Sequence, residues 1–253
     1  MFEITAVPAL QDNYIWIIHN AHVAAAVDPG EAQPVLDFLK QRGLQLRHIL
    51  CTHRHRDHIG GIEKLREVYN VPVYGRQHLN NPFITDDLAD GQKLMLAEFS
   101  LTFEILEVPG HLDDHLAFVA PGILFCGDVL FGAGCGKNFE GTLGQLHHSL
   151  QRLAGLPDDT LVYCAHEYTA YNLPFALVCE PHNDVLQQRN CETLALRALG
   201  KSTVPSTIAL EKATNPFLRC NSPEIIQTLR QRNLLAMGEE AIFAALRRWR
   251  DEF

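Results

Sequence analysis

A chain of 253 residues can bury a full core, either as one large domain or as a domain with a smaller appendage. Its formal net charge of −9, without any cluster of Lys and Arg, argues against a nucleic acid as partner. The N-terminus has an early acid, Glu3, and no basic segment before an apolar run. We therefore expect neither a signal peptide nor contact with a membrane.

Cysteine usage points to a reducing compartment. The seven cysteines are scattered and form no Cys-x-x-Cys pair, as is usual where thiols stay reduced. We expect a cytoplasmic protein, acting as a monomer, in which most cysteines are small core residues. Cys51 adjoins the His-rich segment from Thr52 to His58 but follows the pattern of a buried strand.

The first two thirds of the chain alternate strand and helix patterns. Residues 14–18, 22–27 and 101–108 are predicted strands, and 101–108 alternates apolar and polar positions. Apolar residues then recur at helical spacing in residues 32–39 and 62–69. This alternation predicts a layered core of strands and helices.

Three further apolar runs end abruptly in polar residues. They are residues 49–51 before Thr52, residues 123–126 before Asp128, and residues 161–164 before His166. Each resembles a buried strand that places a functional side chain at its end, where enzymes built on sheets usually carry their chemistry.

After about residue 167 the strand pattern disappears and helices are expected at 184–200, 223–233 and 238–250. Ser222 before Pro223 is typical of a helix N-cap. The change of pattern predicts two domains, residues 1–166 and residues 167–253.

The segment from Thr52 to His58 has the spacing His-x-His-x-Asp-His, which is hard to explain without a metal. In an extended segment side chains at i and i+2 share a side, so His53 and His55 can bind one ion together. Asp57 and His58 lie past a bend and would face a neighbouring ion. Imidazole and carboxylate ligands suit zinc, iron or manganese.

Seven candidate ligands follow strand ends. One metal would take His53, His55 and His111 with Asp128, and the other Asp57, His58 and His166, with Asp128 shared. Each ion would keep a position for water. Taken singly, the last three along the chain, His111, Asp128 and His166, are as compatible with ordinary packing as with metal binding. His115 suits a residue that orients a ligand by hydrogen bonding. Other histidines are expected to be surface or core residues: His19, His22, His48, His78, His147, His148 and His182.

These motifs resemble the metallo-β-lactamase superfamily, through the His-x-His-x-Asp-His segment, Gly110-His111, Gly127-Asp128, His166 and an early Asp28. Within it the chain is most similar to the hydroxyacylglutathione hydrolases, or glyoxalase II. Three further segments carry that similarity: residues 134–142, residues 166–169 and residues 215–219. The resemblance implies an α+β fold, an αββα sandwich followed by a C-terminal helical domain that completes the substrate pocket.

The resemblance also implies a set of substrate-binding residues for glutathione: Lys137, Phe139, Tyr168 and Arg219. The sequence departs from some relatives at two places. Phe139 stands where they have Tyr, which removes a hydroxyl, and Ser222 stands where they have Lys. We therefore expect weaker or differently arranged glutathione binding, with the same reaction.

The implied reaction is hydrolysis of an S-2-hydroxyacylglutathione, such as S-D-lactoylglutathione, as in methylglyoxal detoxification. A hydroxide between two divalent metals, zinc foremost, would attack the thioester carbonyl, and Asp57 would orient it as the catalytic residue. The alternatives are a glutathione persulfide dioxygenase with one iron, a nuclease or lactonase on the same fold, and a non-catalytic metal-binding protein.

Overall fold

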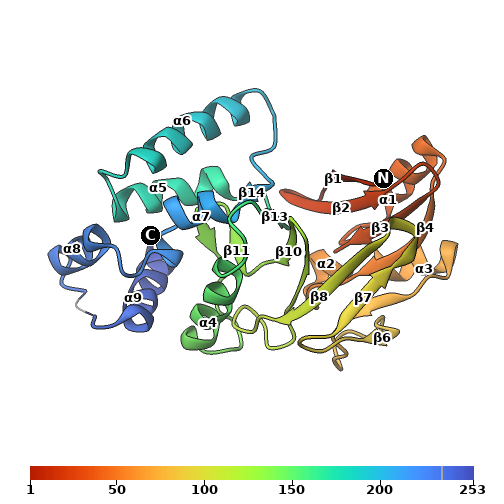
Figure 1. Ribbon diagram of the computed structural model, residues 1–253, viewed down its shortest axis with the longest axis horizontal. Coiled ribbons are helices and arrows are strands. Elements are labelled where there is room, and N and C mark those ends of the chain that lie inside the picture. Colours follow the sequence, from red (N-terminus) through yellow and green to blue (C-terminus); the bar gives the residue numbers. More distant parts are fainter. Residues whose placement is uncertain (235) are drawn as a thin grey trace. The chain divides into compact units, whose positions relative to one another are not determined.

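The computed structural model describes every residue of the chain except 235. The chain consists of two compact units (Figure 1). Unit 1 comprises Met1–Glu107 and Asp114–Gly127, and unit 2 comprises Val108–Asp113 and Asp128–Phe253. The six residues of Val108–Asp113 therefore belong to unit 2 although unit 1 precedes and follows them in the chain. The domain boundary expected after residue 166 stays a prediction.

The first sheet of unit 1 has six strands in chain order: β1 (Glu3–Ala9), β2 (Asn13–His19), β3 (Val23–Val27), β4 (Gln45–Leu50), β5 (Val73–Gly75) and β6 (Asp86–Asp87). The first three are antiparallel, and β3 to β6 are parallel. Parallel neighbours need crossover connections. Helix α1 (Ala32–Arg42) joins β3 to β4, and the short α2 (Arg56–Ile59) and α3 (Ile62–Tyr69) lie between β4 and β5.

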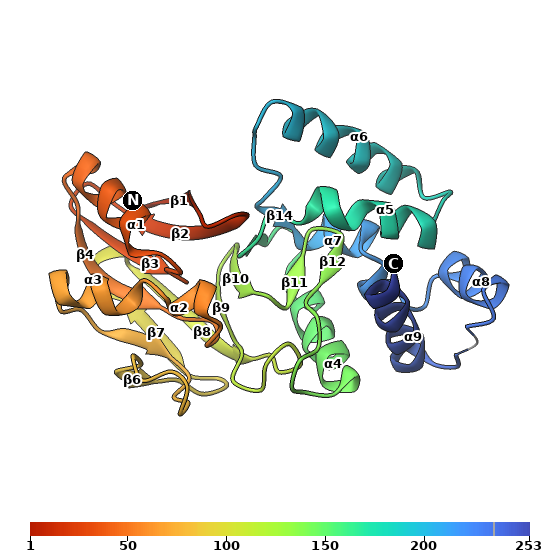
Figure 2. The same cartoon turned by 180° about the vertical axis from the view of Figure 1, so that it is seen from behind.

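Helices α1 and α3 cover one face of this sheet (Figure 2). Val35 and Leu39 of α1 and Ile62 and Leu65 of α3 share an apolar cluster with Ile15, Ile17 and other strand residues. All residues of β2 are buried, so the other face of the sheet is covered as well. The helices predicted from apolar spacing at 32–39 and 62–69 are confirmed.

The second sheet of unit 1 is an antiparallel run of β7 (Lys93–Leu96), β8 (Leu101–Glu107), β9 (Leu116–Ala120) and β10 (Ile123–Gly127), with a 3₁₀ turn η1 (Ala97–Phe99) between the first two. Phe103 of β8 packs against Phe118 and Phe125, at ring-centroid distances of 6.1 and 5.9 Å. The predicted alternation of β8 is confirmed, since Leu101, Phe103 and Ile105 are buried.

Unit 2 contains two small strand pairs. A hairpin is formed by β11 (Leu130–Phe131) and β12 (Gly134–Cys135), and β13 (Leu161–Cys164) pairs with β14 (Ser206–Thr207). The remaining elements are α4 (Leu143–Ala154), α5 (Thr169–Cys179), α6 (Asp184–Ala198), α7 (Ile208–Thr214), η2 (Pro216–Leu218), α8 (Pro223–Gln231) and α9 (Glu239–Glu252). The helices predicted at 184–200, 223–233 and 238–250 correspond to α6, α8 and α9.

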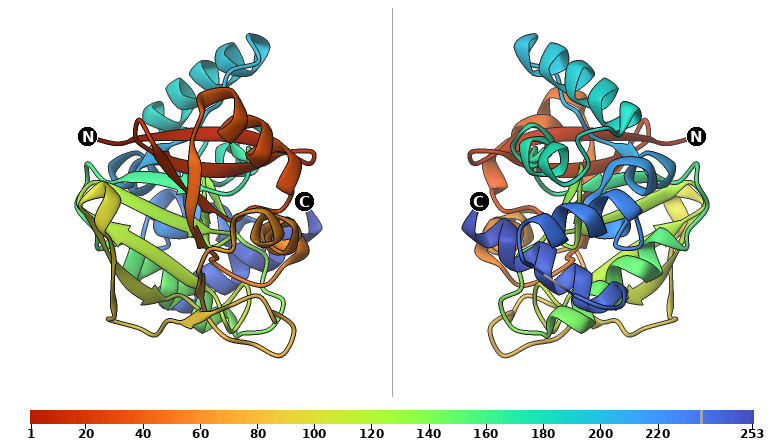
Figure 3. Two further views of the ribbon diagram at one scale, coloured as in Figure 1. Left: turned by 90° about the vertical axis from the view of Figure 1, so that its right-hand side faces the viewer. Right: turned by 90° about the vertical axis from the view of Figure 1, so that its left-hand side faces the viewer.

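An aromatic core joins the helices of unit 2, in which α9 lies beside α4 (Figure 3). Phe175 of α5 stacks on Phe217 at 5.9 Å and meets Trp249 of α9 at 4.9 Å. Ile242 and Leu246 complete the buried stripe of α9 that the sequence predicted. No helix among the described residues is long and apolar enough to cross a lipid bilayer.

A buried ion pair fixes the hairpin of unit 2. Arg189 of α6 lies 2.5 Å from the carboxylate of Glu211 on α7, and both side chains are almost fully buried. The second carboxylate oxygen of Glu211 accepts hydrogen bonds from the Ala133 amide and from the Asn215 side chain, which also donates to the Gly134 carbonyl. The turn between β11 and β12 is therefore held from α6 and α7.

Candidate active site

Four of the candidate ligands lie in unit 1, on the segment that follows β4. The buried strand ends at Leu50, and residues 51–55 lead into α2. Asp28, at the end of β3, accepts hydrogen bonds from both the amide and the hydroxyl of Thr52, each at 2.7 Å. This pair of bonds fixes the start of the ligand segment, so the early Asp28 of the motif has a structural role.

His53 and His55 approach each other through their ring nitrogens, with Nε2 of His53 3.1 Å from Nδ1 of His55. The hydroxyl proton of Thr52 is donated to Asp28, so its oxygen accepts from Nδ1–H of His53 at 3.1 Å. That assignment leaves a lone pair on Nε2 of His53, the state that a metal ligand needs.

Asp57 and His58 form the second pair of unit 1. Nε2 of His58 lies 3.4 Å from Oδ2 of Asp57, while Nδ1 lies 3.1 Å from Asp28. Asn13, at the start of β2, donates its side-chain amide to the Asp57 carboxylate at 3.0 Å and to the Asp57 main-chain carbonyl at 3.4 Å. Asn13 thus orients the carboxylate that the sequence assigns to catalysis. Sequence reasoning missed it because the two residues are far apart in the chain.

Two more contacts hold the ligand segment of unit 1. Arg54 forms an ion pair with Asp114 at 2.5 Å, and their side chains are 7% and 4% exposed. His115 stacks on His53, with ring centroids 4.6 Å apart and an angle of 16° between the planes. His115 is fully buried. Its predicted role, orienting a ligand rather than binding metal, stays a prediction that this stacking supports.

The other three candidate ligands lie in unit 2, where Asp128 faces both histidines. Oδ2 of Asp128 is 3.5 Å from Nε2 of His111, and Oδ1 is 3.3 Å from Nε2 of His166. Nδ1–H of His111 donates to the Lys137 carbonyl at 2.8 Å, which leaves the lone pair on Nε2. One carboxylate oxygen for each imidazole is the arrangement expected of a bridging ligand.

Glycine is required where the hairpin of unit 2 approaches these ligands. A Cβ on Gly136 would lie 1.9 Å from the Asp128 carbonyl oxygen and 3.1 Å from Nδ1 of His111. Any side chain there would push the hairpin away from the two ligands. Gly127, just before Asp128, has a φ of +47°, in the left-handed region that favours glycine.

The donor set fits divalent metal ions. All seven residues are histidines or aspartates and are mostly buried, and His53 and His111 have their second ring nitrogen bound to an oxygen acceptor. Such outer partners fix the tautomer that binds metal. Buried imidazoles facing one another and a carboxylate are otherwise costly, because each polar group needs a partner.

Unit 2 also contains a cavity of about 320 Å³, within the range of small-molecule sites. Its lining is aromatic and cationic, comprising Phe131, Cys135, Lys137, Tyr168, Tyr171, Asn172, Arg247, Arg250, Asp251 and Phe253. Two predicted substrate-binding residues, Lys137 and Tyr168, thus line one cavity. Tyr168 stacks on His166 at 4.6 Å, so the cavity wall is continuous with a candidate metal ligand.

The cations of this cavity differ in what they already bind. Arg247 is buried and pairs with Asp251 at 2.8 Å. Within the described part of the chain, neither Lys137 nor Arg250 has an ion pair or a hydrogen bond from its charged group; Lys137 lies 5.9 Å from the ring of Phe139. Two positive charges are therefore available to an anionic ligand. Arg250 was not predicted, since its helix shows only an apolar stripe in the sequence.

Arg219 and Phe139, the other two predicted substrate-binding residues, are not among the residues that line the cavity. Arg219 makes two contacts with the buried Glu180, at 2.6 and 3.0 Å, and donates to the Lys212 carbonyl. Ser222 stands at the N-cap of α8 as predicted, but its hydroxyl donates to Glu180 and accepts no hydrogen bond from the first amides of the helix. Phe139 is 57% exposed and packs its ring against His111 at 5.2 Å.

The two cysteines beside the candidate site, Cys51 and Cys135, are buried thiols. Six of the seven cysteines are buried, as expected, and all are free thiols. Burial raises the pKa of Cys135, which lines the cavity, to about 11. Burial also raises the pKa of Cys51, beside the ligand segment, far above its usual range. Both thiols are neutral at pH 7 and are poor nucleophiles.

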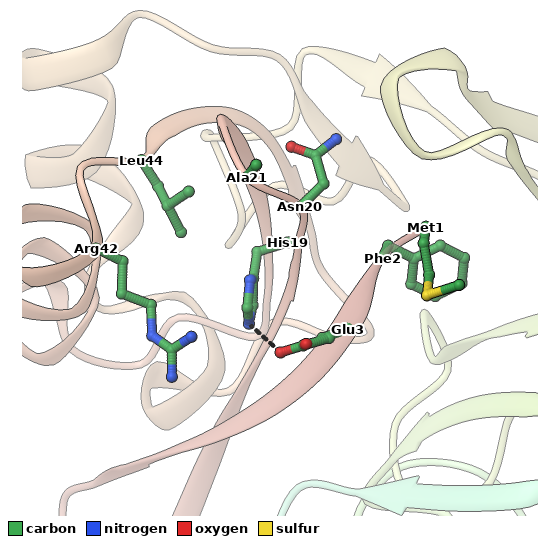
Figure 4. A pocket seen from close by; sticks show the side chains of 8 residues that line it. All are labelled: Met1, Phe2, Glu3, His19, Asn20, Ala21, Arg42 and Leu44. Atoms are coloured by element: carbon green, nitrogen blue, oxygen red, sulfur yellow. Dashed lines mark ion pairs between the residues drawn. The ribbon is translucent and has the colours of Figure 1, made fainter.

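A second cavity, of about 460 Å³, lies in unit 1 between β1, the end of β2 and the end of α1 (Figure 4). His19 faces Glu3 across it at 3.9 Å, and Arg42 lies beside them. Burial lowers the pKa of His19, so its ring is neutral at pH 7. None of the seven candidate ligands lines this cavity.

Comparison with known proteins identifies the class of this fold. A family model described as "Metallo-beta-lactamase superfamily" matches residues 11–166, which include all seven candidate ligands. Another, described as "Hydroxyacylglutathione hydrolase C-terminus", matches residues 167–253. The chain has the metallo-β-lactamase fold, with α/β sheets and a C-terminal helical region, as the sequence predicted.

Individual relatives narrow the class to one family. The chain is 51% identical to a hydroxyacylglutathione hydrolase of Aliivibrio salmonicida and 48% identical to one of Methylobacillus flagellatus, each over the full length of both chains. It therefore belongs to the hydroxyacylglutathione hydrolase family. Among solved structures it is similar to ETHE1 from Myxococcus xanthus, with 27% identity, a TM-score of 0.66 and coverage of 97% and 96% of the two chains. TTHA1623, solved in a di-iron-bound form, is 25% identical with a TM-score of 0.58, over 85% of this chain and all of that one.

Proposed function

We propose that this protein hydrolyses S-2-hydroxyacylglutathione thioesters, such as S-D-lactoylglutathione, to glutathione and a 2-hydroxy acid, and so acts in methylglyoxal detoxification. Its membership of the hydroxyacylglutathione hydrolase family supports the reaction. The observation that carries the proposal is the Asp128 carboxylate, which presents one oxygen to His111 and the other to His166. That arrangement suits a hydrolase with two metals.

We propose that the seven candidate ligands hold two divalent metal ions. One would be bound by His53, His55, His111 and Asp128, and the other by Asp57, His58 and His166. Asp128, which faces both His111 and His166, would be shared between them. Bound metals supply a water ionised near neutral pH and a positive charge for the carbonyl oxygen. We propose zinc, with iron or manganese as alternatives; the di-iron form of TTHA1623 supports iron.

The proposed role of Asp57 is to orient the attacking water by accepting its hydrogen bond. Asn13 donates one hydrogen bond to Oδ2 of the Asp57 carboxylate and another to the Asp57 main-chain carbonyl, and together they restrict the orientation of the carboxylate. The leaving group is a thiolate, whose conjugate thiol has a pKa of ~8.5, so no strong general acid is needed. This agrees with a site whose nearby thiols are neutral.

We propose that the peptide part of the substrate binds in the unit 2 cavity. Glutathione carries two carboxylates, and Lys137 and Arg250 are the two cavity cations whose charges are available. Tyr168 would pack beside the thioester, since its ring stacks on His166. Phe139, against His111, offers a ring without a hydroxyl, which agrees with the expected difference in binding.

The predicted binding role of Arg219 remains a proposal with its own test. Arg219→Ala should raise KM for the glutathione thioester far more than it lowers kcat if Arg219 binds a remote part of the substrate. Unfolding must be measured in parallel, because the change removes the cationic partner of the buried Glu180. An unchanged KM in a folded variant would assign Arg219 to structure alone.

The main test is hydrolysis of S-D-lactoylglutathione by purified protein before and after chelation, with metal content measured in the same samples. We expect activity to disappear with the metals and to return when zinc, iron or manganese is restored. Full turnover by metal-free protein would refute the mechanism. A metal-loaded protein that consumes oxygen with glutathione persulfide but leaves the thioester intact would favour the dioxygenase.

We further propose a cytoplasmic monomer. The buried cysteines, which are free thiols, support a reducing compartment. Light scattering of the purified, metal-loaded protein tests the monomer: the expected mass is 28.4 kDa, and twice that mass would contradict it.

A further inference from the structure

Tyr171 lies in the unit 2 cavity in a position that no part of the proposed reaction requires. It belongs to the first turn of α5, three residues after Tyr168, and the two ring centroids are 6.3 Å apart. Its side chain is 67% exposed, so its ring is accessible from the cavity mouth.

The ring of Tyr171 supports the guanidinium of Arg250. The carbon at the centre of that guanidinium lies 4.5 Å from the Tyr171 ring centroid and 5.8 Å from that of Phe175. Both aromatic residues belong to α5, whereas Arg250 lies near the C-terminal end of α9. A long side chain near a helix end is normally free to sample many rotamers, so these contacts restrict it.

This contact differs from the way Arg247 is held one turn earlier. Arg247 is fixed by Asp251, whose carboxylate also neutralises its charge. An aromatic face attracts a guanidinium without cancelling that charge or using its N–H donors. Arg250 therefore stays cationic and able to form two hydrogen bonds to a carboxylate while its position is restricted.

We propose that Tyr171 is a positioning residue for substrate binding: it holds Arg250 ready for one carboxylate of the glutathione moiety and forms part of the cavity wall. This inference rests on the proposed thioester hydrolase function. It makes Tyr171 a determinant of KM for glutathione thioesters, with no part in the bond-breaking step, which occurs at the metal ligands.

The test compares Tyr171→Ala with Tyr171→Phe in the metal-loaded protein. We expect Tyr171→Ala to raise KM for S-D-lactoylglutathione about fivefold with kcat unchanged, which is the size of one partly exposed cation–π contact. Tyr171→Phe keeps the ring and should behave like the wild type. Because Tyr171 is largely exposed, neither change should affect folding.

Two further measurements separate positioning from a general effect. In an Arg250→Ala background, Tyr171→Ala should raise KM by less than twofold more, because the residue it positions is gone; Arg248→Ala, on the exposed side of α9, is the matched control. With the lactoyl thioester of N-acetylcysteamine, which lacks both carboxylates, Tyr171→Ala and wild type should have equal kcat/KM.

The outcomes distinguish this inference from the proposed function. If wild-type protein does not hydrolyse S-D-lactoylglutathione, the proposed function fails and the inference with it. If wild type hydrolyses it but Tyr171→Ala leaves KM unchanged, or lowers kcat equally on both thioesters, the inference alone is overturned. Fully additive effects of Tyr171→Ala and Arg250→Ala would also overturn it.

Discussion

The two units supply candidate metal ligands in contrasting ways. Unit 1 provides four of them from the short segment between His53 and His58, and a fixed frame of side chains, Asp28 and Asn13, holds that segment. Unit 2 provides three ligands that are far apart in the chain, each beyond the end of a different strand. Ligands that are close together in the chain can be positioned by one well-fixed loop, whereas ligands far apart in the chain are positioned only when the whole fold has formed.

The largest effect should come from the ligand that faces both histidines of unit 2. Asp128→Asn replaces one carboxylate oxygen by an NH₂ group that cannot bind metal, so we expect kcat/KM to fall by about 10³ or more. Metal content per chain should fall as well, as measured by plasma mass spectrometry. Asp159→Asn, on the surface of the same unit, is the control. A variant that keeps both metals and full activity would contradict the bridging role.

A stability effect should follow from breaking the buried ion pair behind the hairpin of unit 2. Glu211→Gln leaves Arg189 without a counter-charge, so we expect the free energy of unfolding to fall by about 3–5 kcal/mol in urea titrations. The exposed pair of Lys212 and Asp158 offers a contrast. Lys212→Met should lower the free energy of unfolding by about 0–1 kcal/mol. Equal losses of unfolding free energy in both variants would show that the buried pair contributes no more to stability than the exposed pair.

The frame of unit 1 should matter for rate more than for metal binding. Asn13→Ala removes the two hydrogen bonds to Asp57, so we expect kcat to fall by about 10- to 100-fold, as for other residues that orient metal ligands. KM and metal content should stay close to wild type. Asn13→Asp, which sets two carboxylates against each other, should be slower still. The assigned role is wrong if Asn13→Ala turns over at the wild-type rate.

The smallest effect concerns the cysteines. Burial raises the pKa of Cys135 to about 11 and that of Cys164 to about 12, so at pH 8 both remain thiols in the folded protein. Among the seven cysteines, all of which the structure describes, only Cys191 is exposed, and we expect Ellman's reagent to titrate one thiol in native protein and seven in guanidinium. Cys191→Ser should reduce the native count to zero with activity unchanged. Fast reaction of a second thiol at pH 8 would contradict the burial of the others.

The sequence was sufficient to predict those helices and strands that are specified by a local pattern of residues. The apolar spacing of α1, α3 and α9, the N-cap sequence before α8 and the alternation of β8 were sufficient to predict those elements. Helix α4 was missed although Thr142 and Gln145 form a capping box, a signal that can be read from the sequence. Helix α5 was missed because it contains Pro174 and lacks a polar face.

The same limit applies to the site. The His-x-His-x-Asp-His spacing and the Gly-rich segment around Lys137 could be found in the sequence, but Asn13 is 44 residues from the aspartate it holds. Arg250 lies on a helix whose sequence shows only an apolar stripe, and its role depends on an aromatic ring contributed by α5. Contacts of this kind depend on tertiary packing, which spacing along the chain does not encode.

The order of the two units along the chain limits how this protein can be divided into fragments. The chain passes from one unit to the other after Glu107, after Asp113 and after Gly127. His111 lies in the short stretch Val108–Asp113. Neither unit is therefore a continuous piece of the gene. A fragment that ends at Glu107 would lose β9 and β10 of unit 1, and one that begins at Asp128 would lose a histidine of unit 2. Recombination between relatives should preserve activity best when the whole stretch from β8 to β11 comes from one parent.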